Sequence, residues 1–211
     1  MVALNFAIIA FTGYLLGSFP TAIIMGKALQ GIDIREHGSG NAGGTNVFRV
    51  LGWKPGVAVI VIDMLKGLAA TVFAAKIALT DLPFEPIYLQ LIAGCSAIIG
   101  HIWTVFAGFQ GGKGVGTAAG MIFGLFPIAA SICLAIFLII AFSTRYVSLA
   151  SITAAVALPI ILFSLSRLFA MAPPPPLFVL SILLAVLIVY THRSNIKRLI
   201  NGTENRFGKR V

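Results

Sequence analysis

The sequence has few charged residues. They occupy only 10% of the 211 positions, and just 6 residues are Asp or Glu. Soluble domains carry about 25% charged residues, so this chain cannot cover a water-soluble surface of its size. Hydrophobic residues make up 59% of the chain. These numbers exclude an ordinary soluble globule and predict an integral membrane protein.

Cysteine and histidine are also scarce. The two cysteines, Cys95 and Cys133, each lie inside an apolar run, and there are three histidines. Neither cysteine is placed for a disulfide framework or a metal site. No metal and no other cofactor is therefore expected.

Basic residues are absent from the first 26 positions. A secretory signal needs a basic start, so the first apolar run is expected to remain as a helix. Over the whole chain, 15 Lys and Arg give a net charge of +9. Cytoplasmic loops and anionic headgroups explain such an excess in a membrane protein, so nucleic acid is not expected as a partner. A few of these cations remain candidates for binding an anionic substrate.

Long apolar runs are what the sequence has in abundance. A membrane helix needs about 20 apolar residues. Pro20 should kink or end the first helix. Helices are predicted over Val2–Met25, Pro55–Leu79, Ile87–Phe109, Val147–Leu168 and Leu177–Tyr190.

The run over 114–142 allows two interpretations. One helix of about 28 residues would put Lys113 and Arg145 on opposite sides, whereas two short helices folded at Phe126-Pro127 would put both on one side. The positive-inside rule favours two helices, each of about 14 residues.

The predicted fold is all-α, a single domain over 1–211 with about seven transmembrane helices. The N-terminus is placed outside and the C-terminus in the cytoplasm. The acidic loop with Asp81 and Glu85 and the proline run Ala172–Pro176 then face outward. The polar stretch Lys27–Lys54 and the tail with six Lys or Arg face the cytoplasm. Five or six passes remain an alternative.

Two glycine-rich segments offer backbone N–H groups to an anion. The first glycine-rich segment, His37–Asn46, has four glycines in seven positions and is followed by Arg49. The second glycine-rich segment, Gly111–Thr117, places Lys113 at a helix start, which favours phosphate. It is no Walker A motif, because Gly114 follows the lysine. A flexible loop and a snorkelling lysine are the plain alternatives.

Two further groups of polar residues lie on predicted helices. Asp63 and Lys66 are three apart inside an apolar run, so they can pair. Charges within a span are costly and suggest function, with a structural ion pair as the alternative. In the C-terminal segment His192–Glu204, a helix would put His192 and Asn195 on one face. A basic membrane anchor is the alternative there, and His101 is expected to be an ordinary bundle histidine.

Together these segments resemble the bacterial acyl-phosphate:glycerol-3-phosphate acyltransferases, the PlsY family. They occur in the family's order from the first helix to the tail, with small departures at Gly44 and Gly116, where Ala is expected in many members. The matching stretches are Gly38-Ser39-Gly40-Asn41 with Thr45-Asn46, Asp63-x-x-Lys66-Gly67, Gly112-Lys113-Gly114-Val115, and His192-Arg193-x-Asn195-Ile196-x-Arg198-Leu199 with Gly202-Thr203-Glu204.

The resemblance implies transfer of a fatty acyl group from acyl phosphate to the sn-1 hydroxyl of glycerol 3-phosphate. The products would be lysophosphatidic acid and phosphate. It implies a multi-pass protein of the bacterial inner membrane, with its site facing the cytoplasm. A monomer without cofactors is expected, in contact with lipid and with the enzyme that supplies acyl phosphate.

The resemblance also implies the site residues. His192, Asn195 and Lys113 are the expected catalytic residues. A His with an Asp five positions later is absent, so the base is either His192 or an oxygen of the acyl phosphate. The expected substrate-binding and phosphate-binding residues are Ser39, Gly40, Asn41, Thr45, Asn46, Arg49, Lys66, Gly112, Gly114, Arg198 and Glu204.

A transporter for a small anion is the main rival, because broken helices and intramembrane charges suit it as well. The polar segments, however, gather on one predicted side, and no inverted repeat is visible. A non-catalytic lipid-binding scaffold is a third hypothesis.

Overall fold

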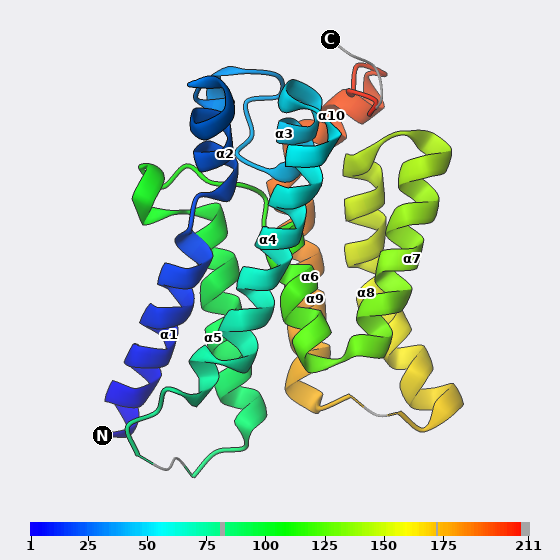
Figure 1. Cartoon of the computed structure of the whole chain (residues 1–211). Helices are drawn as coiled ribbons and strands as arrows, with labels where there is room; N and C mark the ends of the chain where they lie inside the picture. Colours follow the sequence, from blue (N-terminus) through cyan, green and yellow to red (C-terminus); the bar gives the residue numbers. More distant parts are fainter. Residues whose placement is uncertain (81–82, 172, 208–211) are drawn as a thin grey trace. The chain divides into compact units, whose positions relative to one another are not determined.

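The computed structural model describes residues 1–80, 83–171 and 173–207 (Figure 1). Within these ranges every regular element is a helix. The chain divides into two compact units, Met1–Leu125 and Phe126–Arg210. The single domain over 1–211 stays a prediction. The expectations for Asp81 and Ala172, and for the last two cations of the tail, lie outside the described residues.

The all-helical membrane fold is confirmed by helix length and composition. Five spans are long and apolar enough to cross a membrane, or six if the last two helices, bent by 62°, count as one. Large apolar side chains such as Phe11, Phe142 and Leu183 are exposed, as lipid contact requires. Seven passes and the orientation stay predictions.

The first unit begins with a broken helix. α1 (Val2–Ser18) ends before Phe19-Pro20, and α2 (Thr21–Gln30) follows it. The break was predicted at Pro20, which has no N–H to donate. The predicted end at Met25 is wrong, because α2 continues to Gln30 and stops where Gly31 takes φ +69°.

Four more α-helices complete the first unit: α3 (Gly44–Leu51), α4 (Trp53–Val72), α5 (Pro86–Ile102) and α6 (Val115–Leu125). Short 3-10 turns lie at Ile34–Glu36, Ala74–Lys76 and Val105–Ala107. Figure 1 shows α2, α3 and the loop after α5 at one end of this unit, with the N-terminus at the other. The polar segments of the unit therefore share one end.

Small residues let the helices of the first unit approach closely. A Cβ on Gly13 of α1 would lie 2.5 Å from the Ala93 carbonyl oxygen of α5. A Cβ on Gly120 of α6 would overlap the Met64 carbonyl of α4. Close backbone approach through glycine is how membrane helices gain packing energy without a hydrophobic drive. This packing fixes α4, which carries Asp63 and Lys66 at its middle, against α6, and fixes α1 against α5.

The prediction that the third helix reaches Phe109 is wrong. α5 ends at Ile102, and the chain makes a loop in which Gly108 and Phe109 have φ of +64° and +60°. The loop then returns, because Gly111 N–H donates to the Ile102 carbonyl at 3.0 Å. Apolar content alone could not distinguish this loop from helix.

The second unit contains α7 (Pro127–Thr144), α8 (Val147–Phe169), α9 (Pro175–Thr191) and α10 (Arg193–Ile200). The predicted break at Phe126-Pro127 is confirmed: Phe126 has φ −149° and ψ 78°, outside the helical region. The helices on either side have 11 and 18 residues, not two equal halves. α9 starts at Pro175, earlier than the predicted Leu177, because proline is tolerated in a first helical turn.

Candidate active site

The first glycine-rich segment is shaped by one buried amide. Asn46 is 1% exposed, and its Oδ1 accepts from the Ser39 backbone N–H at 2.8 Å. Its Nδ2 donates to the carbonyls of Ile34 and His37, both at 2.9 Å. The loop thus curls around Asn46. Gly40 within it has φ +72°, which other residues rarely adopt.

The hydrogen bonds of Asn46 lie within the loop, where its amide hydrogens are donated to backbone carbonyls and stabilise the loop. Its expected contact with substrate stays a prediction. Ser39 and Gly40 are exposed and Asn41 is half-buried, while Thr45 and Arg49 lie on α3, which begins at Gly44.

Arg35, in the turn before the first glycine-rich segment, pairs with Asp33 and links that turn to the loop after α5. Arg35 Nη2 lies 2.7 Å from Asp33 Oδ2, and Arg35 Nη1 donates to the Ala107 carbonyl at 2.8 Å. The side-chain hydrogen bond from Arg35 lowers the pKa of Asp33 to about 2. The pair remains charged at neutral pH and holds the two segments together.

The second glycine-rich segment is tied to the end of α5. Gly111 N–H and Gly112 N–H donate to the carbonyls of Ile102 and His101, each at 3.0 Å. These carbonyls end a helix and need partners from outside it. Gly114 follows with φ +84°, and α6 begins at Val115. Lys113 therefore stands directly before a helix N-terminus, the position that favours an anion.

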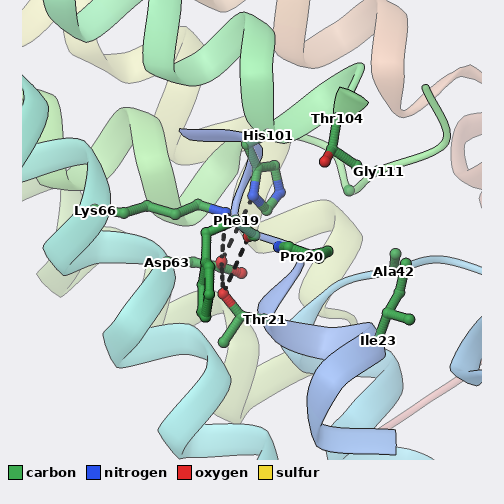
Figure 2. A pocket seen from close by; sticks show the side chains of 11 residues that line it. Phe19, Pro20, Thr21, Ile23, Ala42, Asp63, Lys66, His101, Thr104 and Gly111 are labelled. Carbon is green, nitrogen blue, oxygen red and sulfur yellow. Dashed lines mark hydrogen bonds and ion pairs between the residues drawn. The ribbon is translucent and has the colours of Figure 1, made fainter. Parts of the chain in front are cut away.

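A buried polar cluster lies beside both segments (Figure 2). Lys66 Nζ is 2.9 Å from Asp63 Oδ1, the pair that their spacing predicts. Thr21 Oγ1 donates to the same oxygen at 3.1 Å, and Lys66 also donates to the Phe19 carbonyl at 3.0 Å. His101 Nδ1 lies 3.6 Å from it, at ion-pair distance but beyond a hydrogen bond. The break between α1 and α2 thus supplies partners that offset the cost of charges inside a span.

This cluster forms one wall of a small pocket. Both glycine-rich segments reach the pocket, together with the α1–α2 break, the middle of α4 and the end of α5. The lining residues are Phe19, Pro20, Thr21, Ile23, Ala42, Asp63, Lys66, His101, Thr104, Gly111 and Gly112.

In the second unit, Glu204 joins three polar side chains. Its Oε1 accepts from Asn195 Nδ2 at 2.7 Å and from Ser148 Oγ at 2.9 Å. Its Oε2 accepts from Arg198 Nε at 2.8 Å. Burial alone would raise the pKa of Glu204, but these three hydrogen bonds outweigh burial and hold the pKa below its usual value.

His192 lies where α9 meets α10 and is 3% exposed. Its Nδ1 is 2.8 Å from the Ile188 carbonyl. A carbonyl only accepts, so Nδ1 carries the hydrogen, and a neutral ring then has its lone pair on Nε2. That tautomer is the one a base at Nε2 requires.

The tail after α10 is fastened to the turn between α7 and α8. Phe207 N–H donates to the Arg145 carbonyl at 2.9 Å. Arg206 Nε donates to the Tyr146 hydroxyl at 3.0 Å and its guanidinium stacks over that ring. These contacts hold Glu204 over α8.

The structure brings the predicted residues together in two groups. Lys66, Gly112, Gly114 and the first glycine-rich segment belong to the first unit, and Asn195, Arg198 and Glu204 form a cluster in the second. Glu204, expected to bind substrate, accepts hydrogen bonds from Ser148, Asn195 and Arg198, and its contact with substrate stays a prediction. Sequence reasoning missed Thr21 and Ser148, since an isolated hydroxyl residue in an apolar run carries no signal.

The fold and the polar clusters define the chain as a polytopic membrane protein in which two glycine-rich segments meet at a pocket with a buried lysine. The family model described as glycerol-3-phosphate acyltransferase matches residues 7–202. The chain therefore belongs to the glycerol-3-phosphate acyltransferase family.

Individual relatives agree with this assignment. The glycerol-3-phosphate acyltransferase of Chlorobaculum parvum is 49% identical, over 98% of this chain and 99% of its own length. That of Chlorobium phaeobacteroides is 47% identical, over 94% and 95%. The crystal structure of PlsY, an integral membrane glycerol 3-phosphate acyltransferase, in its glycerol 3-phosphate form has a TM-score of 0.83. It is 39% identical to this chain and covers 96% of both chains.

Proposed function

We propose that this protein transfers a fatty acyl group from acyl phosphate to the sn-1 hydroxyl of glycerol 3-phosphate. The products are lysophosphatidic acid and inorganic phosphate. The observation that carries the proposal is the meeting of two glycine-rich segments at one pocket whose lining includes Lys66, with Lys113 next to Gly112 in the sequence. Both substrates carry phosphate. Because the N–H groups of Gly111 and Gly112 bond within the loop, Lys113 and the N–H groups that open α6 are the groups proposed to bind it.

The reaction needs little covalent help from the protein. The hydroxyl oxygen attacks the acyl carbonyl carbon, the C–O bond to phosphate breaks, and the phosphate leaves. Fixed N–H groups and Lys113 stabilise the negative charge that moves onto the leaving group. Holding both substrates in one orientation removes much of the entropic barrier.

The hydroxyl proton has two candidate acceptors. One is His192 Nε2, since Nδ1 already faces the Ile188 carbonyl. The other is an oxygen of the acyl phosphate. Asn195 is the expected orienting group, and its amide is held by Glu204. If His192 is the base, His192→Ala should lower kcat by roughly 10²–10⁴-fold.

The membrane is part of the proposed chemistry. The acyl donor arrives from lipid, and glycerol 3-phosphate arrives from water. We place the protein in the bacterial inner membrane with its site toward the cytoplasm, working as a monomer without cofactors. Contact with the enzyme that makes acyl phosphate belongs to this proposal.

The test uses the purified chain in detergent with glycerol 3-phosphate and either acyl phosphate or acyl coenzyme A. Turnover with acyl phosphate alone supports the proposal, since no coenzyme A site is indicated by the sequence. Turnover with acyl coenzyme A but not with acyl phosphate would contradict the proposal that acyl phosphate is the donor. Binding of both substrates without product would favour the scaffold hypothesis, and anion flux in proteoliposomes without product would favour the transporter.

A further inference from the structure

His101 has no part in the function proposed above, yet it lies where the polar segments of the first unit meet. It is 7% exposed and comes one residue before the end of α5. Figure 2 shows its ring beside Asp63, in agreement with the 3.6 Å between Nδ1 and Asp63 Oδ1. A histidine that only filled space in a helix bundle would not need this position.

Asp63 fixes one side of the imidazole. Its Oδ1 is shared by Lys66, Thr21 and His101 Nδ1, the last at 3.6 Å. Because Lys66 and Thr21 hold the carboxylate from α4 and from the start of α2, the carboxylate is a fixed point for the ring. A connected buried network of this kind restricts its members to one arrangement.

The other side of the ring rests on Gly112. A Cβ at Gly112 would overlap His101 Nε2 and would lie 3.0 Å from the Ala42 carbonyl oxygen. The His101 main chain holds the same residue, since its carbonyl accepts from Gly112 N–H at 3.0 Å. Gly112 is thus the point where His101 and both glycine-rich segments touch.

We infer that His101 is a positioning residue for glycerol 3-phosphate, an inference that rests on the proposed function. Its ring, set by Asp63, fixes the path of Gly111-Gly112 and hence the place of Lys113 and of the N–H groups that open α6. His101 acts through Gly112, against which its ring lies. Its loss should weaken phosphate binding more than it slows the chemical step.

Kinetics of two single variants and their combination test this inference. His101→Ala should raise the KM for glycerol 3-phosphate roughly tenfold, with kcat changed by less than about threefold, because displaced binding groups lose alignment. Gly112→Ala should raise the KM for glycerol 3-phosphate at least as much. In the double variant the added methyl meets no imidazole, so its further effect should be smaller than in the wild type.

Two controls separate positioning from general damage. Ile9→Ala removes a fully buried side chain of α1 that packs with Ala74 and Ala93, so it should lower Tm without changing KM. His101→Gln keeps a polar group near Asp63 without the ring, and its KM should lie between those of wild type and His101→Ala. If His101→Ala does not fold, this variant and Gly112→Ala carry the test.

Binding is also measured without the acyl donor, as the rise in Tm with increasing glycerol 3-phosphate. If the Tm of the wild type rises with glycerol 3-phosphate but no acyl transfer occurs, only the proposed reaction fails. The concentration of glycerol 3-phosphate needed to raise Tm in the His101 variants then still tests His101. Unchanged KM and unchanged dose dependence in the His101 variants would overturn the inference. A fall in kcat with unchanged KM in these variants would overturn it too. A wild type whose Tm does not rise with glycerol 3-phosphate would overturn both the proposed function and the role of His101.

Discussion

At the scale of single residues, spacing along a helix predicted local pairs, and folding added partners from distant segments. Asp63 and Lys66 pair as their i,i+3 positions require. Thr21 joins the same carboxylate from 42 residues away, and no pattern in the sequence announces it. Asn46 and Glu204 were predicted as substrate-binding residues, and that stays a prediction. Their hydrogen bonds to Ser39 and to Ser148 join residues far apart in the sequence or outside any helical spacing, so only the folded structure shows them.

Lys113 gives the first prediction at this scale. Lys113→Met should reduce kcat/KM roughly 10–10²-fold, because a hydrogen bond to a charged group contributes about 1.5–3 kcal/mol. Steady-state kinetics with both substrates measure it. Lys54→Met is the matched control, since Lys54 is exposed on α4 and should leave the kinetics unchanged. If Lys113→Met and Lys54→Met have the same kinetics, Lys113 is not part of the active site.

Glu204 gives a prediction for stability against pH. Its pKa in the folded protein is below the ordinary value of 4.5, so its bonds stabilise the fold fully above that pH. The contribution fades as pH falls from 4.5 toward the lowered pKa. Glu204→Gln should therefore lower Tm at pH 7, by an amount that shrinks in more acid solution.

Thermal unfolding in detergent from pH 7 to pH 3.5 follows this difference. Glu85→Gln serves as control, because Glu85 is exposed and makes no capping hydrogen bond. If the difference in Tm between wild type and Glu204→Gln stays constant with pH, the charge of the carboxylate does not contribute to stability.

At the scale of elements, helix existence was predictable and several helix ends were not. Pro20 and Pro127 lack an N–H, so breaks at these places follow from covalent structure. The end of α5 depends on Gly111 and Gly112 returning to its last carbonyls, a contact that only the folded chain makes. The loop after Ile102 is apolar, so hydropathy predicts that the helix continues through it.

Packing between α4 and α6 can be tested with two glycines of the same helix. A Cβ at Gly120 would overlap the Met64 carbonyl, so Gly120→Ala should lower stability by about 1–3 kcal/mol. At Gly124 the nearest atoms are side-chain atoms of Leu68, Thr71 and Val72 at 3.2–3.4 Å. Those groups can yield, and alanine favours helix by about 1 kcal/mol over glycine, so Gly124→Ala should be near neutral. Equal Tm values for both variants would contradict the close packing.

At the scale of the whole molecule, composition alone identified a membrane protein, whereas topology depends on counting short and broken helices. α6 has 11 residues, too few to span by itself, so hydropathy cannot decide whether it counts as a pass. α2, α3 and the loop after α5 share one end of the first unit (Figure 1), and that this end faces the cytoplasm stays a prediction.

Cysteine labelling tests the predicted orientation. In a chain with Cys95 and Cys133 replaced by Ala, Phe84→Cys should react with a membrane-impermeant maleimide on intact cells. Ser39→Cys and Ser194→Cys should react only after the membrane is opened. Reaction of Ser39→Cys and Ser194→Cys under different conditions would rule out a common cytoplasmic side.

The central claim is acyl transfer from acyl phosphate to glycerol 3-phosphate, and product stoichiometry tests it most directly. Lysophosphatidic acid and inorganic phosphate are measured together over time in one reaction of the purified chain. The expected result is one phosphate for each lysophosphatidic acid, with the acyl group on the sn-1 oxygen and neither product formed without glycerol 3-phosphate. Phosphate release without lysophosphatidic acid, or no release at all, would contradict the account.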